Sequence, residues 1–351
     1  MDLVARLGLS VPLIQAPMAG TSTAAMAAAV SRAGALGSIA AGTLTPQAAA
    51  QEIAAVRAAT GRPFNVNLFT HAPCMPDPAR EAAWLDAIAP LFAEFGALPP
   101  EELRTIYPSF AGNREMLGVL VDLAPPAVSF HFGLPDAQAI AALKAAGCLL
   151  LATATSLDEA SAARKAGIDA VVAQGWEAGG HRGIFDPEGP DSQLGTLALT
   201  RLIAAQSGLP VIAAGGIMDG AGIRAALDLG AAAVQMGTAF IACPESKADE
   251  AYLAALAGDA AWHTSMVSAI SGRPARCLAN RFTDFAASPG LPPAAPYPRA
   301  YDAGKALNAA AVRQGETGFG AQWAGQGAPL ARPMPAGELV ALLAKELAAT
   351  R

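Results

Sequence analysis

The sequence predicts an α/β fold, a (β/α)8 TIM barrel with a mostly helical lid domain after the last strand. Eight short apolar runs recur along the first 240 or so residues, and helical runs fill the seven gaps between them. Most of the apolar runs show no polar face, as expected of strands that are covered on both sides in a parallel sheet. Eight such strand–helix units are the number that closes a barrel.

Each predicted strand is a short apolar run bounded by turn residues. In chain order the strands are Leu13–Met18, Leu36–Ala41, Phe64–Phe69, Ala127–Phe132, Cys148–Ala154, Ala170–Gln174, Pro210–Ala214 and Ala232–Met236. The alternative is a doubly wound open sheet, whose first strand should lead into a Gly-x-Gly-x-x-Gly turn. The turn here is Ala16-Pro17-Met18-Ala19-Gly20, which favours the barrel.

The predicted helices are Ala-rich segments between these strands. They are Ala24–Arg32, Pro46–Ala59, a segment within Asn113–Leu123, Asp136–Ala145, Leu157–Lys165, Leu197–Gln206 and Gly220–Leu229.

Two regions interrupt the alternation, and they set the predicted domain boundaries. Residues 1–242 form the barrel, with a Pro-rich insert over 70–112 that is too long for an ordinary loop and is expected to be irregular. Residues 243–332 form the lid. Residues 333–351 form a C-terminal helix, because Pro335–Thr350 carries leucines along one stripe, and this helix should pack back on the barrel.

Composition excludes several classes of protein. The 351 residues are 53% hydrophobic and 15% charged, with a net charge of −6 and no basic run, which argues against nucleic-acid binding. No apolar run reaches the roughly 18–20 residues that span a bilayer. The Met-Asp start lacks a secretory signal, so we expect a cytoplasmic protein with reduced thiols. The four cysteines are widely spaced without a Cys-x-x-Cys motif, and no metal site is expected.

The predicted active site lies where the strands end, since barrels bind ligands at that face. Gly215-Gly216 follows the seventh strand and Gly237-Thr238 follows the eighth. Barrels commonly build a phosphate site from these two turns. A tight turn without a ligand is the alternative interpretation of Gly215-Gly216, and the second turn weakens it.

A glycine-rich loop ends the sixth strand, and His181 stands at its tip. The loop reads Gln174-Gly-Trp-Glu-Ala-Gly-Gly-His181. Glycine lets backbone approach a ligand closely, and histidine has an unperturbed pKa near neutrality. We interpret His181 as catalytic, the alternative being a solvated loop histidine. Asn67 and Gln174 are amides at strand ends that suit the edge of a ring such as flavin, or that simply cap the strands.

Together, these motifs resemble those of the FMN-dependent nitronate monooxygenases, formerly called 2-nitropropane dioxygenases. They are Gln15-Ala-Pro-Met18, Asn65-Val-Asn67, the loop that ends in His181, Ala214-Gly-Gly-Ile217 and Gln235-Met-Gly-Thr238. The resemblance covers essentially the whole chain. Relatives with the same barrel motifs include FMN-dependent enoyl-acyl-carrier-protein reductases and NADH:quinone reductases, so these motifs specify the cofactor better than the substrate.

The lid sequence distinguishes among these relatives. Tyr297, Tyr301 and Lys305 follow one another at four-residue spacing, which places them on one helix face if Pro298 lies in the first turn. Such a face would form a pocket wall for a small anion, and a surface helix is the alternative. The pattern resembles class I nitronate monooxygenases. That resemblance implies a substrate pocket of Tyr107, His131, His181, Tyr297, Tyr301 and Lys305.

The resemblance implies FMN as cofactor, held by strand ends and glycine turns. The implied cofactor-binding residues are Ala16, Pro17, Met18, Asn67, Gln174, Gly179, Gly180, Ala214, Gly215, Gly216, Gln235, Met236, Gly237 and Thr238. The implied partners are a small anionic nitronate, propionate 3-nitronate among them, and O2. The implied products are a carbonyl compound and nitrite, formed through a flavin semiquinone, with His181 as base or hydrogen-bond donor.

Several residues stay outside this assignment. His71 and His263 are expected to be surface or structural residues. Trp176 is expected to pack in the protein or to wall the pocket. The Gln322–Gly327 segment is expected to approach the flavin as a late lid loop. The other function classes are a reductase of the same fold that takes hydride from NAD(P)H, and a non-catalytic flavin-binding protein.

Overall fold

The structure is a computed structural model that describes residues 3–350. Eight parallel strands form a ring of neighbours in the order β1-β9-β8-β6-β5-β4-β3-β2. Leu36, just before β2, bridges Ile14 of β1 and closes the barrel. The strands are β1 (Leu13–Gln15), β2 (Gly37–Ala40), β3 (Phe64–Phe69), β4 (Ala127–His131), β5 (Leu149–Ala154), β6 (Ala170–Gln174), β8 (Val211–Ala214) and β9 (Ala233–Met236). The predicted (β/α)8 barrel is confirmed.

Alternate residues of each strand face different parts of the core, as the two-residue period of a strand requires. Leu150 of β5 and Val171 of β6 pack outward against the helices. Leu151 and Val172, their neighbours in sequence, pack into the barrel interior with Ile14. Both faces of the strands are therefore apolar, which explains the continuous hydrophobic runs in the sequence.

Helices lie in all seven gaps between the barrel strands, within two residues of the predicted bounds. They are α2 (Ala24–Arg32), α3 (Pro46–Ala59), α5 (Arg114–Leu123), α6 (Ala137–Ala145), α7 (Leu157–Ala166), α8 (Thr196–Gln206) and α9 (Gly220–Asp228). Most begin with a capping side chain; Ser156, for example, accepts a hydrogen bond from the N–H of Glu159. A short helix that was not predicted, α1 (Leu3–Arg6), packs Leu3 against the first residues of several strands.

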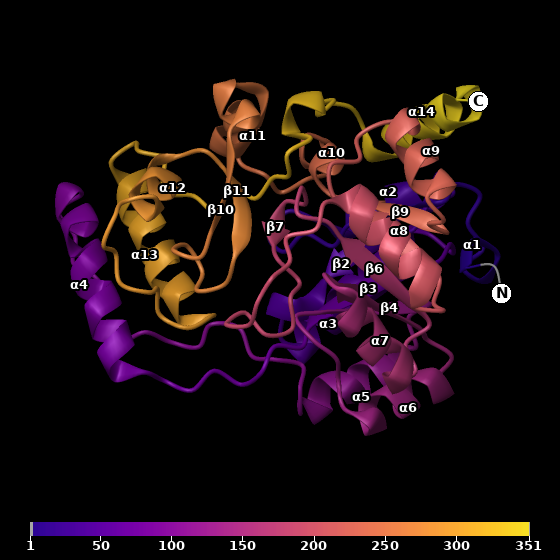
Figure 1. Cartoon of the computed structure of the whole chain (residues 1–351), viewed down its shortest axis with the longest axis horizontal. Coiled ribbons are helices and arrows are strands. Elements are labelled where there is room, and N and C mark those ends of the chain that lie inside the picture. The colour runs from indigo at the N-terminus through magenta and orange to yellow at the C-terminus, as the bar shows by residue number, and fades with distance from the viewer. Residues whose placement is uncertain (1–2, 351) are drawn as a thin grey trace.

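The C-terminal segment returns to the barrel. Helix α10 (Thr238–Ile241) follows β9 directly, and α14 (Ala336–Ala349) lies against α9 and α2 (Figure 1). Leu339, Val340 and Leu343 of α14 are buried. The amphipathic stripe in the sequence is therefore the face that α14 packs on the barrel.

The lid contains a small antiparallel sheet that was not predicted. Its strands, in spatial order, are β10 (Thr264–Val267), β11 (Ala275–Leu278) and β7 (Gly180–His181). Around it lie α11 (Glu250–Ala257), α12 (Arg281–Ala286), α13 (Arg299–Arg313) and 3-10 turns at Asp259–Trp262 and Ala328–Leu330; a further turn, Ala41–Thr43, follows β2. Strand β7 belongs to the glycine loop of the barrel, so the sheet joins barrel and lid.

The insert over 70–112 was expected to be irregular, but it contains the 17-residue helix α4 (Pro78–Glu94). Helix α4 lies beside α13 of the lid, far from the helices of the barrel (Figure 1). Trp84, Ile88 and Phe92 are buried there in a shared cluster with lid residues. The helix was not predicted because its flanks are rich in proline and its apolar face packs on a segment about 200 residues later.

Ion pairs connect the insert to the lid. Arg299 of α13 makes two hydrogen bonds to the Glu81 carboxylate, at 2.6 and 2.7 Å. Arg104 pairs with Asp302 at 2.9 Å, and Arg281 pairs with Glu94 at 2.5 Å. Bidentate arginine–carboxylate pairs fix orientation as well as distance. The insert therefore belongs structurally with the lid.

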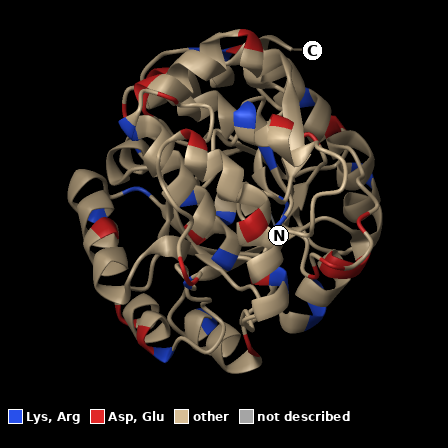
Figure 2. Ribbon diagram, turned by 90° about the vertical axis from the view of Figure 1, so that its left-hand side faces the viewer, with Lys and Arg blue, Asp and Glu red and all other residues tan. Residues whose placement is uncertain are grey.

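Acidic and basic residues are interspersed along the ribbon in Figure 2, without a long segment of one sign. Within residues 3–350, no helix is long and apolar enough to cross a membrane. All four cysteines in this part of the chain are free thiols.

Candidate active site

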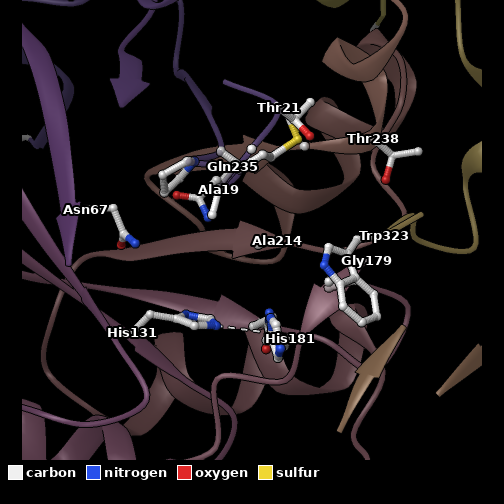
Figure 3. Close-up of a pocket in the computed structure, with 18 of the residues that line it drawn as sticks. Ala19, Thr21, Asn67, His131, Gly179, His181, Ala214, Gln235, Thr238 and Trp323 are labelled. Atoms are coloured by element: carbon white, nitrogen blue, oxygen red, sulfur yellow. Dashed lines mark hydrogen bonds between the residues drawn. The ribbon is translucent and has the colours of Figure 1, made fainter. Parts of the chain in front are cut away.

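A cavity of about 560 Å³ opens at the carboxyl ends of the barrel strands, between barrel and lid (Figure 3). Every residue predicted to bind cofactor or substrate lines it. From the barrel come Ala16, Pro17, Met18, Asn67, His131, Gln174, Gly179, Gly180, His181, Ala214, Gly215, Gly216, Gln235, Met236, Gly237 and Thr238. From the insert and the lid come Tyr107, Tyr297, Tyr301 and Lys305. Residues spread over nearly 300 positions of sequence thus share one cavity.

Asn67 presents a hydrogen-bond donor to this cavity. Its Oδ1 accepts from the Ser129 hydroxyl at 2.8 Å. Ser129 in turn accepts from the amide of Asn65 at 2.9 Å, below the cavity floor. This series of hydrogen bonds leaves the Nδ2 group of Asn67 as its free polar end, and an amide NH2 can only donate. The donor suits the acceptor nitrogen or carbonyl edge of a flat heterocycle.

The side chain of Gln174 holds the glycine loop. Its Nε2 donates to the backbone carbonyl of His181 at 2.9 Å, and its Oε1 accepts from the N–H of Gly183 at 2.7 Å. One N–H of the amide remains for a ligand. Across the cavity, Gln235 makes no side-chain hydrogen bond to another described residue, so its whole amide is available (Figure 3).

Two glycines after β8 form a turn that suits an anion. Gly215 has φ +123° and Gly216 has φ +70°, values that residues with a Cβ rarely adopt. Successive N–H groups in a turn can face one concave side, which binds phosphate and other anions. Gly237 and the Thr238 hydroxyl lie on the same cavity wall. The donors of this wall fit a phosphate, and the amides of Asn67 and Gln235 fit a ring, so the cavity fits a flavin nucleotide.

His181 is positioned by the lid sheet. As part of β7 it pairs with Ala275 of β11. Its Nε2 lies 2.8 Å from the hydroxyl of Ser271, and its Nδ1 has no hydrogen-bond partner among the described residues. The rings of Tyr297, at 5.4 Å, and Trp323, at 5.1 Å between centroids, surround it. Desolvation by these neighbours lowers the pKa of His181 to about 3, so the imidazole is neutral at neutral pH.

His131 uses both ring nitrogens for protein contacts. Nε2 lies 3.1 Å from the backbone carbonyl of His181, and Nδ1 lies 2.9 Å from the Thr153 hydroxyl (Figure 3). Burial lowers its pKa to about 4, which keeps the ring neutral. Substrate binding was predicted for His131, but neither nitrogen is free to make a hydrogen bond to a substrate. Its ring can contact a ligand, and its hydrogen bonds support the His181 loop.

The lid wall is built as two tyrosines and a cation. Lys305 Nζ lies 5.5 Å from the ring centroid of Tyr107 and 5.2 Å from that of Tyr301. These distances are within the range of cation–π attraction. Lys305 forms no ion pair in the described part of the chain, so its charge can be neutralised by a ligand. Burial raises the pKa of Tyr301, which stays a neutral hydrogen-bond donor.

Tyr297 reaches the cavity by a different route from the one predicted. Pro298 is the N-cap of α13 rather than a residue of its first turn, so Tyr297 precedes the helix. Only Tyr301 and Lys305 share the helix face. The hydroxyl of Tyr297 is buried without a hydrogen-bond partner among the described residues, and burial raises its pKa. An unpaired buried hydroxyl on a cavity wall is a group that a ligand can satisfy.

A buried group that sequence analysis missed stands behind this wall. Arg273 is 3% exposed and forms no ion pair within residues 3–350. Its guanidinium lies 4.3 Å from the centroid of the Phe132 ring and donates to the carbonyl of Ile184. Burying an unpaired cation is costly. Arginine in a stretch with no other motif gave no signal in the sequence.

His71 is structural, one of the two roles expected of it, and fully buried. Its ring lies 5.1 Å from that of Tyr297, edge to face. Burial, with Arg273 nearby, lowers its pKa to about 4. His263, by contrast, is exposed.

The two loop tryptophans have different roles. Trp176 lies outside the cavity lining and packs against the guanidinium groups of Arg182 and Arg276. Trp323, within the expected late loop, lines the cavity beside His181 and Gly179 (Figure 3). The same loop approaches the phosphate wall, where the N–H of Gly325 donates to Thr238 at 3.0 Å. The sequence indicated the loop but not the tryptophan.

Comparison with known proteins agrees with this geometry. The sequence model of a family described as nitronate monooxygenase matches residues 2–346. A nitronate monooxygenase of Paraburkholderia phytofirmans is 57% identical over 345 residues, 98% of this chain and 94% of the relative. One of Pseudomonas aeruginosa is 57% identical over 341 residues, covering 97% of each chain.

Solved structures show the same architecture. The chain is similar to a nitroalkane oxidase from Streptomyces ansochromogenes, with a TM-score of 0.89, 41% identity and 98% coverage of both chains. It is also similar to FabK from Thermotoga maritima, with a TM-score of 0.73, 27% identity, and coverage of 99% of this chain and 95% of that one.

Proposed function

Since the chain belongs to the nitronate monooxygenase family, we propose that its cavity binds FMN and oxidises propionate 3-nitronate and related alkyl nitronates with O2. Oxidation of nitronates is the activity of the family, and a flavin is the cofactor that the family implies. FMN and the particular nitronate are the finer parts of the proposal.

FMN, rather than a dinucleotide, is supported by the shape of the donor set. The glycine turn at Gly215-Gly216 and the wall at Gly237-Thr238 form one site for a phosphate. Asn67 and Gln235 provide amides for the ring system.

Four free cysteines support the proposed cytoplasmic location, because such compartments keep thiols reduced.

The flavin would supply the redox chemistry, and the protein positions and polarises the substrate. Lys305, a cation without an ion pair among the described residues, would attract and hold the anion. The hydroxyls of Tyr297 and Tyr301 would donate hydrogen bonds to nitro or carboxylate oxygens. Their raised pKa keeps both hydroxyls protonated for this purpose.

His181 would serve one of two roles, depending on the substrate. A neutral nitroalkane must first lose a proton from the carbon that bears the nitro group, and the neutral imidazole can accept it. A nitronate supplied as the anion needs only a hydrogen bond. The observation that carries the proposal is the meeting of His181, the two tyrosines and Lys305 in the cavity that also has the phosphate turn.

The test measures oxygen consumption and nitrite release by the purified protein supplied with propionate 3-nitronate. The same measurement with a neutral nitroalkane compares the wild type with His181→Asn. Turnover with nitrite as product is expected. One observation favours a second function, since FabK shares this fold. A flavin reductase would lose its flavin colour when NADH is added without oxygen and would leave the nitronate unreacted. That combination would overturn the proposal, and flavin binding without any turnover would indicate a non-catalytic protein.

A further inference from the structure

Ser271 is buried at the centre of the loop that joins β10 to β11. Its Oγ lies 2.8 Å from Nε2 of His181 and 3.2 Å from the backbone carbonyl oxygen of Arg273. A serine hydroxyl has one proton and two acceptor lone pairs. The direction in which it donates therefore determines where the proton of the neutral His181 ring lies.

The carbonyl of Arg273 decides between the two directions. A carbonyl oxygen can only accept, and the Ser271 hydroxyl is its hydrogen-bond partner in the described part of the chain. If Ser271 donated to His181, this carbonyl would be left unpaired in the interior, which is unfavourable. With Ser271 donating to the carbonyl, its oxygen accepts from the ring, so Nε2 of His181 carries the proton.

We propose that Ser271 is the positioning residue that fixes His181 with its proton on Nε2 and leaves Nδ1 as the atom that accepts a proton from a neutral nitroalkane. This inference rests on the proposed function. In the step, the carbon–hydrogen bond next to the nitro group breaks and its proton moves to Nδ1. The electron pair stays on the nitroalkane, which becomes the nitronate anion. The imidazolium that forms keeps its Nε2–H bonded to Ser271.

The loop that carries Ser271 is held tightly in place. A Cβ on Gly272, which has φ +91°, would lie 2.4 Å from the carbonyl oxygen of Ala295 and 2.6 Å from the nitrogen of Tyr297. Strand pairing between β11 and β7 fixes the backbone of His181 from the other side. Ser271 and His181 are thus held by neighbouring, paired segments. This is the arrangement of a base that is oriented by a third group.

The direct test is ¹⁵N NMR of the FMN-loaded protein with labelled histidine. The chain has only four histidines, and loss of one signal in His181→Gln assigns the ring. At neutral pH we expect a protonated Nε2 and an unprotonated Nδ1. In Ser271→Ala both signals should move toward the values of a ring that exchanges between its two tautomers. A protonated Nδ1 in the wild type, or an unchanged spectrum in Ser271→Ala, would overturn the inference.

Kinetics provide the second readout. Ser271→Ala should lower kcat/KM for neutral nitroethane by roughly 10-fold, part of the usual contribution of general-base catalysis. The rate with nitroethane supplied as its nitronate should change less than about 2-fold. Ser271→Thr keeps the hydroxyl and should restore both the spectrum and the rate. Equal losses on the two substrate forms, with no rescue by threonine, would also overturn the inference.

The matched control is Ser268→Ala, an exposed serine on the same loop. It should leave the spectrum and both rates unchanged. The spectrum is independent of turnover. A protein with the expected tautomer that releases no nitrite would refute the proposed function alone, whereas nitrite release with a protonated Nδ1 would refute the role of Ser271 alone.

Discussion

Nε2 of His131 lies 3.1 Å from the backbone carbonyl oxygen of His181, and this contact fixes the proton of His131. Because the carbonyl can only accept, Nε2 is the donor, and Nδ1 accepts the proton of the Thr153 hydroxyl. One pocket histidine thus holds the main chain of the other.

Replacing His131 with Phe should therefore impair the site without touching the proton-transfer step. The variant removes both hydrogen bonds but keeps an aromatic ring. We expect kcat to fall by about the same factor, roughly 10-fold, for a neutral nitroalkane and for its nitronate, since both need an ordered His181 loop. The free energy of unfolding should fall by about 1–3 kcal/mol. Steady-state kinetics and urea unfolding measure these effects, with exposed His263→Phe as control. A loss confined to the neutral nitroalkane would show that His131 itself takes part in proton transfer.

Lys305→Met tests the lid lysine that lies beside the rings of Tyr107 and Tyr301. Methionine keeps the length and apolar contacts of the side chain but removes the ammonium. Hydrogen bonds to charged groups contribute about 1.5–3 kcal/mol, so affinity for propionate 3-nitronate should drop by an order of magnitude or more. The nitronate of nitroethane, which has no carboxylate, should lose less. Inhibitor and substrate titrations measure this, and exposed Lys345→Met on α14 is the control. Unchanged affinity for both anions would show that Lys305 does not hold the substrate.

Two substitutions at Gly216 separate backbone strain from charge in the proposed phosphate site. Alanine adds only a Cβ, in ordinary contact with Glu177 at 3.4 Å, at a φ of +70° that costs about 1–2 kcal/mol. Aspartate, which tolerates a positive φ no worse than alanine, adds a carboxylate. We expect Gly216→Ala to retain part of its flavin and Gly216→Asp to lose it, as measured by absorbance of the purified proteins. Equal flavin content in the two variants would show that this turn does not bind the phosphate.

Acid should destabilise the protein through its buried histidines. The pKa of His71 is about 4 in the folded chain and about 6.5 when unfolded. Between these values the unfolded state binds more protons, so stability falls as pH drops from 6.5 to 4 and this loss is complete below 4. His71 contributes roughly 3 kcal/mol to the fall. His71→Phe, which suits the aromatic contacts there, should flatten the urea-derived stability curve over this range. His263→Phe is the control, and equal slopes in wild type and His71→Phe would contradict the assignment.

The barrel and the residues that line its cavity were predictable because both follow local rules. Each strand is an apolar run, and parallel topology brings the strand ends together, so Asn67, Gln174 and Gly215 could be grouped without any structure. Tyr301 and Lys305 were predictable because four-residue spacing defines a helix face.

The rest depends on contacts between distant segments. Helix α4 was missed because its flanks are rich in proline and its partner is α13. The sheet β10-β11-β7 was missed because one of its strands has two residues. Ser271 and Arg273 lie on the loop between β10 and β11, and they meet His181 and Phe132 only in the folded chain. Their neighbours in sequence form no pattern that indicates a site.

The lid that covers the cavity is assembled from two separate pieces of chain, with α4 and Arg104 supplied by an insert and α13 by the C-terminal third. Anyone who transplants this lid onto a related barrel to change its substrate range must therefore exchange both pieces together. A graft of residues 243–332 alone would expose the apolar side of α13. It would also leave Arg299 without its partner Glu81, and Asp302 without its partner Arg104. Natural variation in substrate preference should follow the same constraint, with changes in the insert accompanied by changes in α13.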